Sequence, residues 1–266
     1  MFNSKVFVAE FIGTFALVFI GAGAGIVNAG LVGIALAYGF TLAVFSYIYG
    51  HISGSHLNPA VTFGLALNGT VKWVQAIFYW IAQFAGAILA AFLLKTLVTT
   101  VDPTLTIQAG ATAGVLTEQA PLLAMAVEAI LTFFLVNTIL HATVGGKGGL
   151  FAGWAIGMTY AFAILAGAPF TGASLNPART FGVALFSAPS ISDVYTYVIY
   201  FFGPLVGSTF AVLVFNFLDK PEDSMEDFLD EDDDDDDDED EILIVEEEPT
   251  PVKAKKPAVR RKTVKE

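Results

Sequence analysis

The chain has no cysteine, and its first 218 residues carry very little charge. The lack of cysteine excludes disulfides, thiolate catalysis and thiolate metal sites. Residues 1–218 hold five basic and five acidic side chains, so the net charge of −13 lies entirely in residues 219–266. With 55% hydrophobic residues, the composition is more apolar than that of an ordinary soluble domain.

Several kinds of site are also missing. No nucleophile stands in a pattern with a base, and no cofactor motif occurs, so the sequence predicts neither an enzyme nor a bound cofactor. His51 and His141 are too far apart in sequence to suggest a metal site. The acidic block 230–241 would repel phosphate, which argues against nucleic acid as a partner.

Long apolar segments are what the sequence does contain. Each is long enough, or nearly so, to cross a hydrocarbon layer about 30 Å thick as a helix. Strands would need alternating polarity and a closed barrel, so the predicted class is an all-α membrane protein. Glu10 interrupts the first apolar run, which favours a retained span over a cleaved signal. The predicted spans are residues 6–28, 31–49, 73–98, 120–142, 150–168 and 194–218.

The chain repeats itself. E-x-x-x-T-F begins at Glu10 and Glu128, and N-P-A begins at Asn58 and Asn176, so both motifs recur after 118 residues. Each copy holds three spans. Because three is odd, the second copy must insert upside down, as in the inverted repeats of transport proteins. The predicted channel domain is residues 1–218, with repeats at about 1–100 and 119–218.

Each N-P-A motif predicts the start of a helix. Asparagine is a preferred N-cap, and proline fits the first helical position. The apolar run that follows is only half a span, which predicts two re-entrant half-helices whose positive N-terminal ends meet near the membrane midplane. The motif residues are Asn58, Pro59, Ala60, Asn176, Pro177 and Ala178.

A glycine-containing strip precedes each half-helix. Irregular backbone at membrane depth must be buried in protein or line a cavity, so we expect the strip carbonyls to line a pore. Glu10 and Glu128 could form a proton relay, but their matched positions favour structural carboxylates that accept strip N–H groups. His56 could titrate as a gate, although a packed residue is favoured. The predicted pore-lining carbonyls belong to Gly54, Ser55, His56, Leu57, Gly172, Ala173, Ser174 and Leu175.

Such a pore suits neutral molecules. Water exchanges its hydrogen bonds for those of the wall at little net cost, whereas an ion loses its hydration shell. The two helix ends add a positive barrier to protons and cations. A coupled transporter is the alternative class. It would need ionisable coupling residues at the midplane, and Glu10 and Glu128 are the only candidates. A structural junction protein is a third class, and it would need neither an open pore nor Arg179.

With these motifs the chain resembles the aquaporin family, the major intrinsic proteins, over residues 5–218. The resemblance implies a homotetramer with one pore per subunit. It also implies an outer selectivity filter, whose four positions fall on Tyr38, Ile164, Ala173 and Arg179.

The predicted filter matches neither the typical water-selective members of the family nor its typical glycerol facilitators. Ile164 stands where water-selective members have histidine. With this isoleucine, the predicted filter resembles that of archaeal-type members with a broadened solute range. Thr180, Ala184, Tyr200 and Phe201 differ from the residues typical of glycerol facilitators. The sequence therefore predicts a water channel that also passes small neutral solutes, with a glycerol facilitator as the alternative.

Charges predict the orientation. Lys5, Lys72 and Lys147 fall on the same side as the tail, which the positive-inside rule makes cytoplasmic. The prediction is a multi-pass protein of the plasma membrane with both termini in the cytoplasm. Residues 219–266 are acidic and then basic, which predicts a disordered tail whose basic end could bind anionic membrane lipid.

Overall fold

The computed structural model describes residues 2–102 and 104–219, and this part of the chain is helical with no strand. The predicted tail, residues 219–266, lies outside the described residues apart from Asp219. Six helical segments are long and apolar enough to cross a membrane, as predicted. They run over Ser4–Ile26, Gly30–Ser53, Trp73–Val101, Pro121–Val144, Gly149–Thr171 and Val194–Leu218.

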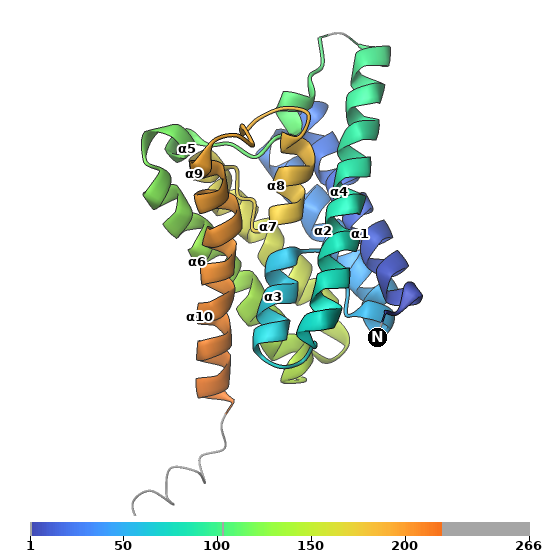
Figure 1. The fold of residues 1–266 in the computed structure, drawn as a ribbon, viewed down its shortest axis with the longest axis vertical. Helices are drawn as coiled ribbons and strands as arrows, with labels where there is room; N and C mark the ends of the chain where they lie inside the picture. Colours follow the sequence, from blue (N-terminus) through green and yellow to red (C-terminus); the bar gives the residue numbers. More distant parts are fainter. Residues whose placement is uncertain (1, 103, 220–266) are drawn as a thin grey trace, which may run out of the picture. The chain divides into compact units, whose positions relative to one another are not determined.

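Three of the six spans are single α-helices, and three are interrupted near one end (Figure 1). The single helices are α1 (Ser4–Ile26), α2 (Gly30–Ser53) and α4 (Trp73–Val101). The fourth span continues from α6 (Pro121–Ile139) into a π-helical turn, η2 (Leu140–Val144). The fifth joins η3 (Gly149–Phe151) to α7 (Ala152–Thr171), and the sixth joins α9 (Val194–Tyr197), η4 (Val198–Phe202) and α10 (Gly203–Leu218).

Two short helices lie inside this bundle. α3 (Pro59–Leu67) has nine residues and α8 (Pro177–Ala184) has eight. At 1.5 Å per residue each is about 12–14 Å long, which is under half of a hydrocarbon layer. They lie one above the other in the middle of the bundle (Figure 1). Two shorter elements, η1 (Ile107–Gly110) and α5 (Val115–Gln119), belong to the connection between α4 and α6.

Small residues allow the spans to pack closely in pairs. α2 packs against α7, where a Cβ built on Gly157 would lie 2.3 Å from the Gly39 carbonyl oxygen. α1 packs against α4, where a Cβ on Gly86 would lie 2.4 Å from the Phe11 carbonyl oxygen. Glycine at such contacts lets helix backbones approach in a lipid environment, where hydrophobic exclusion does not drive association.

The outer surface of the spans is apolar. Val74 on α4 is 61% exposed, and Phe210 on α10 is 56% exposed. Large exposed hydrophobic side chains of this kind also occur on α1, α2, α6 and α7. A water-facing surface would not carry so many of them, so this face of the protein contacts lipid or another membrane subunit.

Candidate functional site

The strips that precede α3 and α8 have the same unusual backbone. Gly54 and Gly172 end α2 and α7 in the left-handed conformation, with φ of 83° and 81°. This conformation costs an L-residue other than glycine about 1–2 kcal/mol. Further contacts must therefore hold the strips in place. The non-glycine strip residues with positive φ are Ser55, Leu57, Ala173 and Leu175.

Glu10 of α1 holds the first strip. Its Oε1 accepts hydrogen bonds from the Ser53 hydroxyl at 2.6 Å and the His56 amide at 2.9 Å. Its Oε2 accepts from the Leu57 amide at 2.7 Å and from the Gln83 side chain at 2.8 Å. Glu10 is fully buried, and a buried carboxylate is tolerated only when its oxygens are satisfied in this way.

Glu128 of α6 holds the second strip with an equivalent set of bonds. Its Oε1 accepts from the Thr171 hydroxyl at 2.7 Å and the Ser174 amide at 2.9 Å, and its Oε2 from the Leu175 amide at 2.8 Å. Each donor lies 118 residues after its counterpart around Glu10. Gln83 is the exception: in the last span of each repeat the offset is 121 residues, and the matching residue is Pro204, which has no side-chain donor.

Asparagine side chains join the two half-helices. The Asn58 amide Nδ2 donates to the Leu175 carbonyl oxygen at 2.8 Å, and the Asn176 Nδ2 donates to the Leu57 carbonyl oxygen at 2.8 Å. The side-chain oxygens cap the helices, that of Asn58 accepting from the Ala60 amide and that of Asn176 from the Arg179 amide. The N-terminal ends of α3 and α8 are therefore in direct contact.

In each asparagine, one side-chain N–H is used on the opposite strip. An NH₂ group has two donors, so one N–H of each asparagine is left for a permeant. The leucine carbonyls that receive these bonds keep a second lone pair.

Arg179 lies in the first turn of α8 and is 4% exposed. Its Nη1 donates to the Thr112 hydroxyl at 3.0 Å and to the Ala173 carbonyl oxygen at 3.1 Å, and its Nη2 donates to the Gly172 carbonyl oxygen at 3.3 Å. The guanidinium carbon lies 4.5 Å from the centroid of the Tyr38 ring. Within residues 2–102 and 104–219, its buried Nε has no hydrogen-bond partner.

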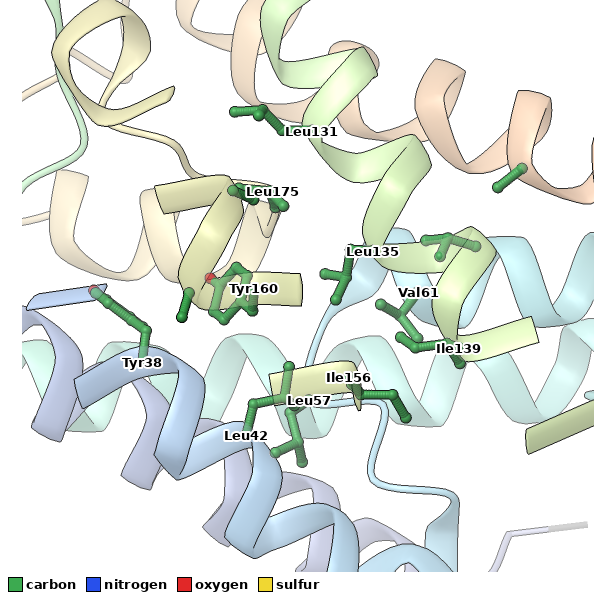
Figure 2. Close-up of a cluster of buried hydrophobic side chains, with 14 of the residues drawn as sticks. Tyr38, Leu42, Leu57, Val61, Leu131, Leu135, Ile139, Ile156, Tyr160 and Leu175 are labelled. Atoms are coloured by element: carbon green, nitrogen blue, oxygen red, sulfur yellow. The ribbon is translucent and has the colours of Figure 1, made fainter. Parts of the chain in front are cut away.

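Three of the four predicted filter residues are thus in contact: Tyr38, Ala173 and Arg179. Ile164, the fourth, is buried in the hydrophobic cluster that also contains Tyr38 and Ala173. Figure 2 shows part of this cluster, with Tyr38 on α2 facing Tyr160 on α7. Their assignment as a selectivity filter remains a prediction.

His56 packs beside the first strip. Its Nδ1 lies 3.0 Å from the Thr62 hydroxyl, and its ring centroid lies 4.5 Å from that of Tyr79. His56 also lines a cavity of about 360 Å³ together with Ser46, Gly54 and Ile156. The lining also includes Leu65 of α3 and Thr70, which follows that helix. Among the described residues, no group of three or more His, Cys, Asp or Glu side chains could hold a metal ion.

The two strips differ in what their carbonyls contact. Arg179 donates to Gly172 and Ala173, the Tyr160 hydroxyl donates to Ser174 at 3.0 Å, and Asn58 donates to Leu175. All four carbonyls of the second strip therefore receive a side-chain hydrogen bond. In the first strip, only the Leu57 carbonyl receives one from the described part of the chain.

Several residues of this site are not predicted from the sequence. Tyr79 and Tyr200 donate to the Ser53 and Thr171 carbonyl oxygens, each at 2.7 Å, and the repeat offset of 121 residues in the last spans could have revealed this pair. For Tyr160 the only indication in the sequence is its position one helical turn before Ile164, which is weaker than a match between the repeats. Thr112 lies in a connection for which the repeat offers no matching position.

Comparison with known proteins settles the family. The family described as major intrinsic protein matches residues 1–215 of this chain. The chain belongs to the major intrinsic protein family. It is 41% identical over 230 residues to a probable aquaporin TIP2-2 of Oryza sativa subsp. japonica, covering 80% of this chain and 87% of the relative. It is 39% identical over 227 residues to aquaporin TIP2-1 of Arabidopsis thaliana, covering 79% of this chain and 86% of the relative.

A solved structure of this family has the same fold. The X-ray structure of the aquaglyceroporin from Plasmodium falciparum matches with a TM-score of 0.65 and 26% identity, covering 85% of this chain and 99% of that one. These matches confirm the predicted fold of six spans and two half-helices. As a major intrinsic protein, the chain is a multi-pass membrane channel for water or small neutral solutes, and it is not an enzyme.

Proposed function

We propose that water is the main permeant and that it passes through one pore in each subunit, which runs along the two strips and past the paired ends of the half-helices. The observation that carries this proposal is the reciprocal contact between the ends of α3 and α8. Asn58 and Asn176 each bond to the strip that precedes the other. Each keeps one amide N–H, so two donors remain for a permeant where the two half-helices meet.

The chemistry of this stretch discriminates by charge. Water can accept from the asparagine amides and donate to free lone pairs of the strip carbonyls, at little net cost in hydrogen bonding. A cation meets the positive ends of two helices and a guanidinium, and it loses hydration that the pore does not replace. Protons and ions are therefore excluded.

The outer filter sets the upper size of the permeant. Arg179 supplies donors and positive charge, while the matching position in the first repeat is Val61, so the charge is present at one end only. Ile164 removes the polar wall that a histidine would supply. Small neutral solutes such as urea and glycerol are therefore expected to follow water at lower rates.

A glycerol facilitator is the second candidate. Two observations favour it: the structural neighbour is an aquaglyceroporin, and Ile164 makes the filter more apolar. Against it, Tyr38 packs over the Arg179 guanidinium and occupies space that a polyol would need. The relatives named above are aquaporins, which supports water.

Assembly and location form part of the proposal. The family resemblance supports a homotetramer in contact with membrane lipid, and the apolar outer surface provides area for both. Lys5, Lys72 and Lys147 support an orientation with both termini in the cytoplasm, and we propose the plasma membrane as the location. The charged tail is expected to lie on the cytoplasmic side.

Paired flux measurements on one preparation test the proposal. Purified protein in proteoliposomes is mixed rapidly with an impermeant osmolyte, and vesicle shrinkage reports water permeability. The same vesicles in a glycerol gradient report glycerol permeability. Water permeability well above that of empty vesicles, with a smaller rise for glycerol, is expected. No rise for water would contradict the proposal, and a glycerol rise as large as that for water would favour the second candidate.

A further inference from the structure

Tyr160 lies at the inner edge of the predicted filter. It precedes Ile164 by four residues on α7, so the two side chains lie on the same helix face, one turn apart. Its ring meets that of Tyr38 edge to face, with centroids 5.8 Å apart and an interplanar angle of 81°. Figure 2 shows the two rings side by side. Tyr160 is 1% exposed, so its position is fixed by packing.

The Tyr160 hydroxyl reaches the second strip. It donates to the Ser174 carbonyl oxygen at 3.0 Å. Ser174 follows the filter position Ala173 and precedes Leu175, whose carbonyl receives Asn58. The phenol therefore sits along the proposed pore between Arg179 and the asparagine pair, and it occupies one acceptor site of the wall.

The first repeat has no equivalent. The residue 118 positions before Tyr160 is Leu42, which is also buried but has no donor. The carbonyl that matches Ser174 is that of His56, which receives no hydrogen bond from the described residues. The tyrosine is therefore an asymmetric feature, confined to the half of the chain that carries Arg179. By contrast, the tyrosine hydroxyls of Tyr79 and Tyr200 bond to matching carbonyls in both repeats.

We propose that Tyr160 is a further specificity-determining residue of the channel. It forms a second narrow step inside the filter, and it withholds the Ser174 carbonyl from solutes that need several hydrogen bonds. Water needs fewer partners and less width, so it is affected least. This narrow step limits the passage of solutes that the substitution of histidine by Ile164 at the filter would otherwise admit. This inference rests on the proposed function, since it concerns the ranking of solutes in the same pore.

Two substitutions separate the effect of the size of the Tyr160 side chain from the effect of its hydroxyl group. Tyr160→Phe keeps the ring and frees the Ser174 carbonyl, and we expect glycerol and urea permeability to rise about threefold, within the range for one hydrogen bond. Tyr160→Leu copies the residue of the first repeat and also removes bulk, and a larger rise of about tenfold is expected. Water permeability should change by less than about twofold in both.

Tyr79→Phe and Tyr200→Phe are the matched controls. Each removes a largely buried tyrosine hydroxyl that donates to a carbonyl at the start of a strip, at Ser53 or Thr171. A structural role predicts that water and solute permeability fall together, with no change in their ratio. That is the result expected for the controls and not for the Tyr160 variants.

The measurement is the ratio of glycerol to water permeability in proteoliposomes, normalised to the amount of protein. A higher ratio in both Tyr160 variants, with unchanged ratios in the controls, supports the inference. Unchanged ratios in Tyr160→Phe and Tyr160→Leu overturn it, whether or not total flux falls. A wild-type protein that conducts no water would instead contradict the proposed function, so the two failures are distinguishable.

Discussion

Glu10 and Glu128 hold the two strips with matching hydrogen bonds, 118 residues apart in sequence. Each accepts two strip amides and one hydroxyl. The strips contain left-handed residues other than glycine, so these bonds offset conformational strain. The carboxylates thus act through the backbone that they position.

Replacing either carboxylate tests this role. Glutamine at position 128 presents one oxygen and one NH₂ group, so one of the two amide donors, at Ser174 or Leu175, loses its acceptor. We expect Glu128→Gln to lower the free energy of unfolding by about 1–3 kcal/mol. Thermal unfolding in detergent measures this, together with a fall in water permeability. Glu118→Gln is the control, because Glu118 is exposed on α5.

A proton relay makes a different prediction for the same variant. If Glu128 carried protons, Glu128→Gln would abolish a proton flux that the wild-type protein shows. We expect no such flux in the wild-type protein. A pH-sensitive dye inside the vesicles reports it directly.

The asparagine pair should control water permeability. Asn58→Ala removes the cap of α3 and the bond to the Leu175 carbonyl, and the loss of a cap alone costs about 0.5–2 kcal/mol. We expect water permeability per folded protein to fall several-fold. Asn3→Ala is the matched control, since Asn3 caps α1 away from the pore. Equal effects of the two variants would argue against a role of Asn58 in permeation.

Arg179 should exclude solutes and cations. Arg179→Val copies Val61 of the first repeat and removes the charge and the contacts to Thr112 and Ala173. Glycerol permeability is expected to rise about tenfold, equivalent to about 1.4 kcal/mol in the barrier. A measurable proton flux should accompany it. Lys95→Ala serves as a control for loss of a cation on the outer half, and no change in either flux is expected.

Ile164 should set the solute range. Ile164→His introduces a polar wall opposite Tyr38, and we expect urea and glycerol permeability to fall several-fold while water permeability is retained. The ratio of solute to water permeability is the readout. A solute flux that does not fall would show that position 164 does not limit the pore. Ile156→His, at the inner cavity, is the control substitution.

Much of the fold could be predicted from the sequence because the membrane allows few alternatives. Every backbone group must be paired inside the lipid, so the apolar segments had to be helices, and the six predicted spans are confirmed. The half-helices were also predictable, because Asn58–Pro59 and Asn176–Pro177 combine a cap with a preferred first residue.

The residues that hold the strips were predictable from the agreement of the two repeats, whereas the filter residues, Arg179 among them, were assigned through the family resemblance. Glu10 and Glu128 could be found from their spacing to the asparagines. Thr112 could not, because the loop that brings it to Arg179 has no counterpart in the first repeat and no regular pattern. The contact of Tyr160 with Ser174 depends on how α7 packs on the strip, which spacing along one helix does not determine.

The temperature dependence of water permeability tests the central claim most directly, since a pore along the strips and past the half-helix ends lets water cross without entering lipid. We predict that proteoliposomes shrink faster than empty vesicles with a weak temperature dependence, and that Asn58→Ala reduces this component while Asn3→Ala does not. A steep temperature dependence equal to that of empty vesicles would contradict the account.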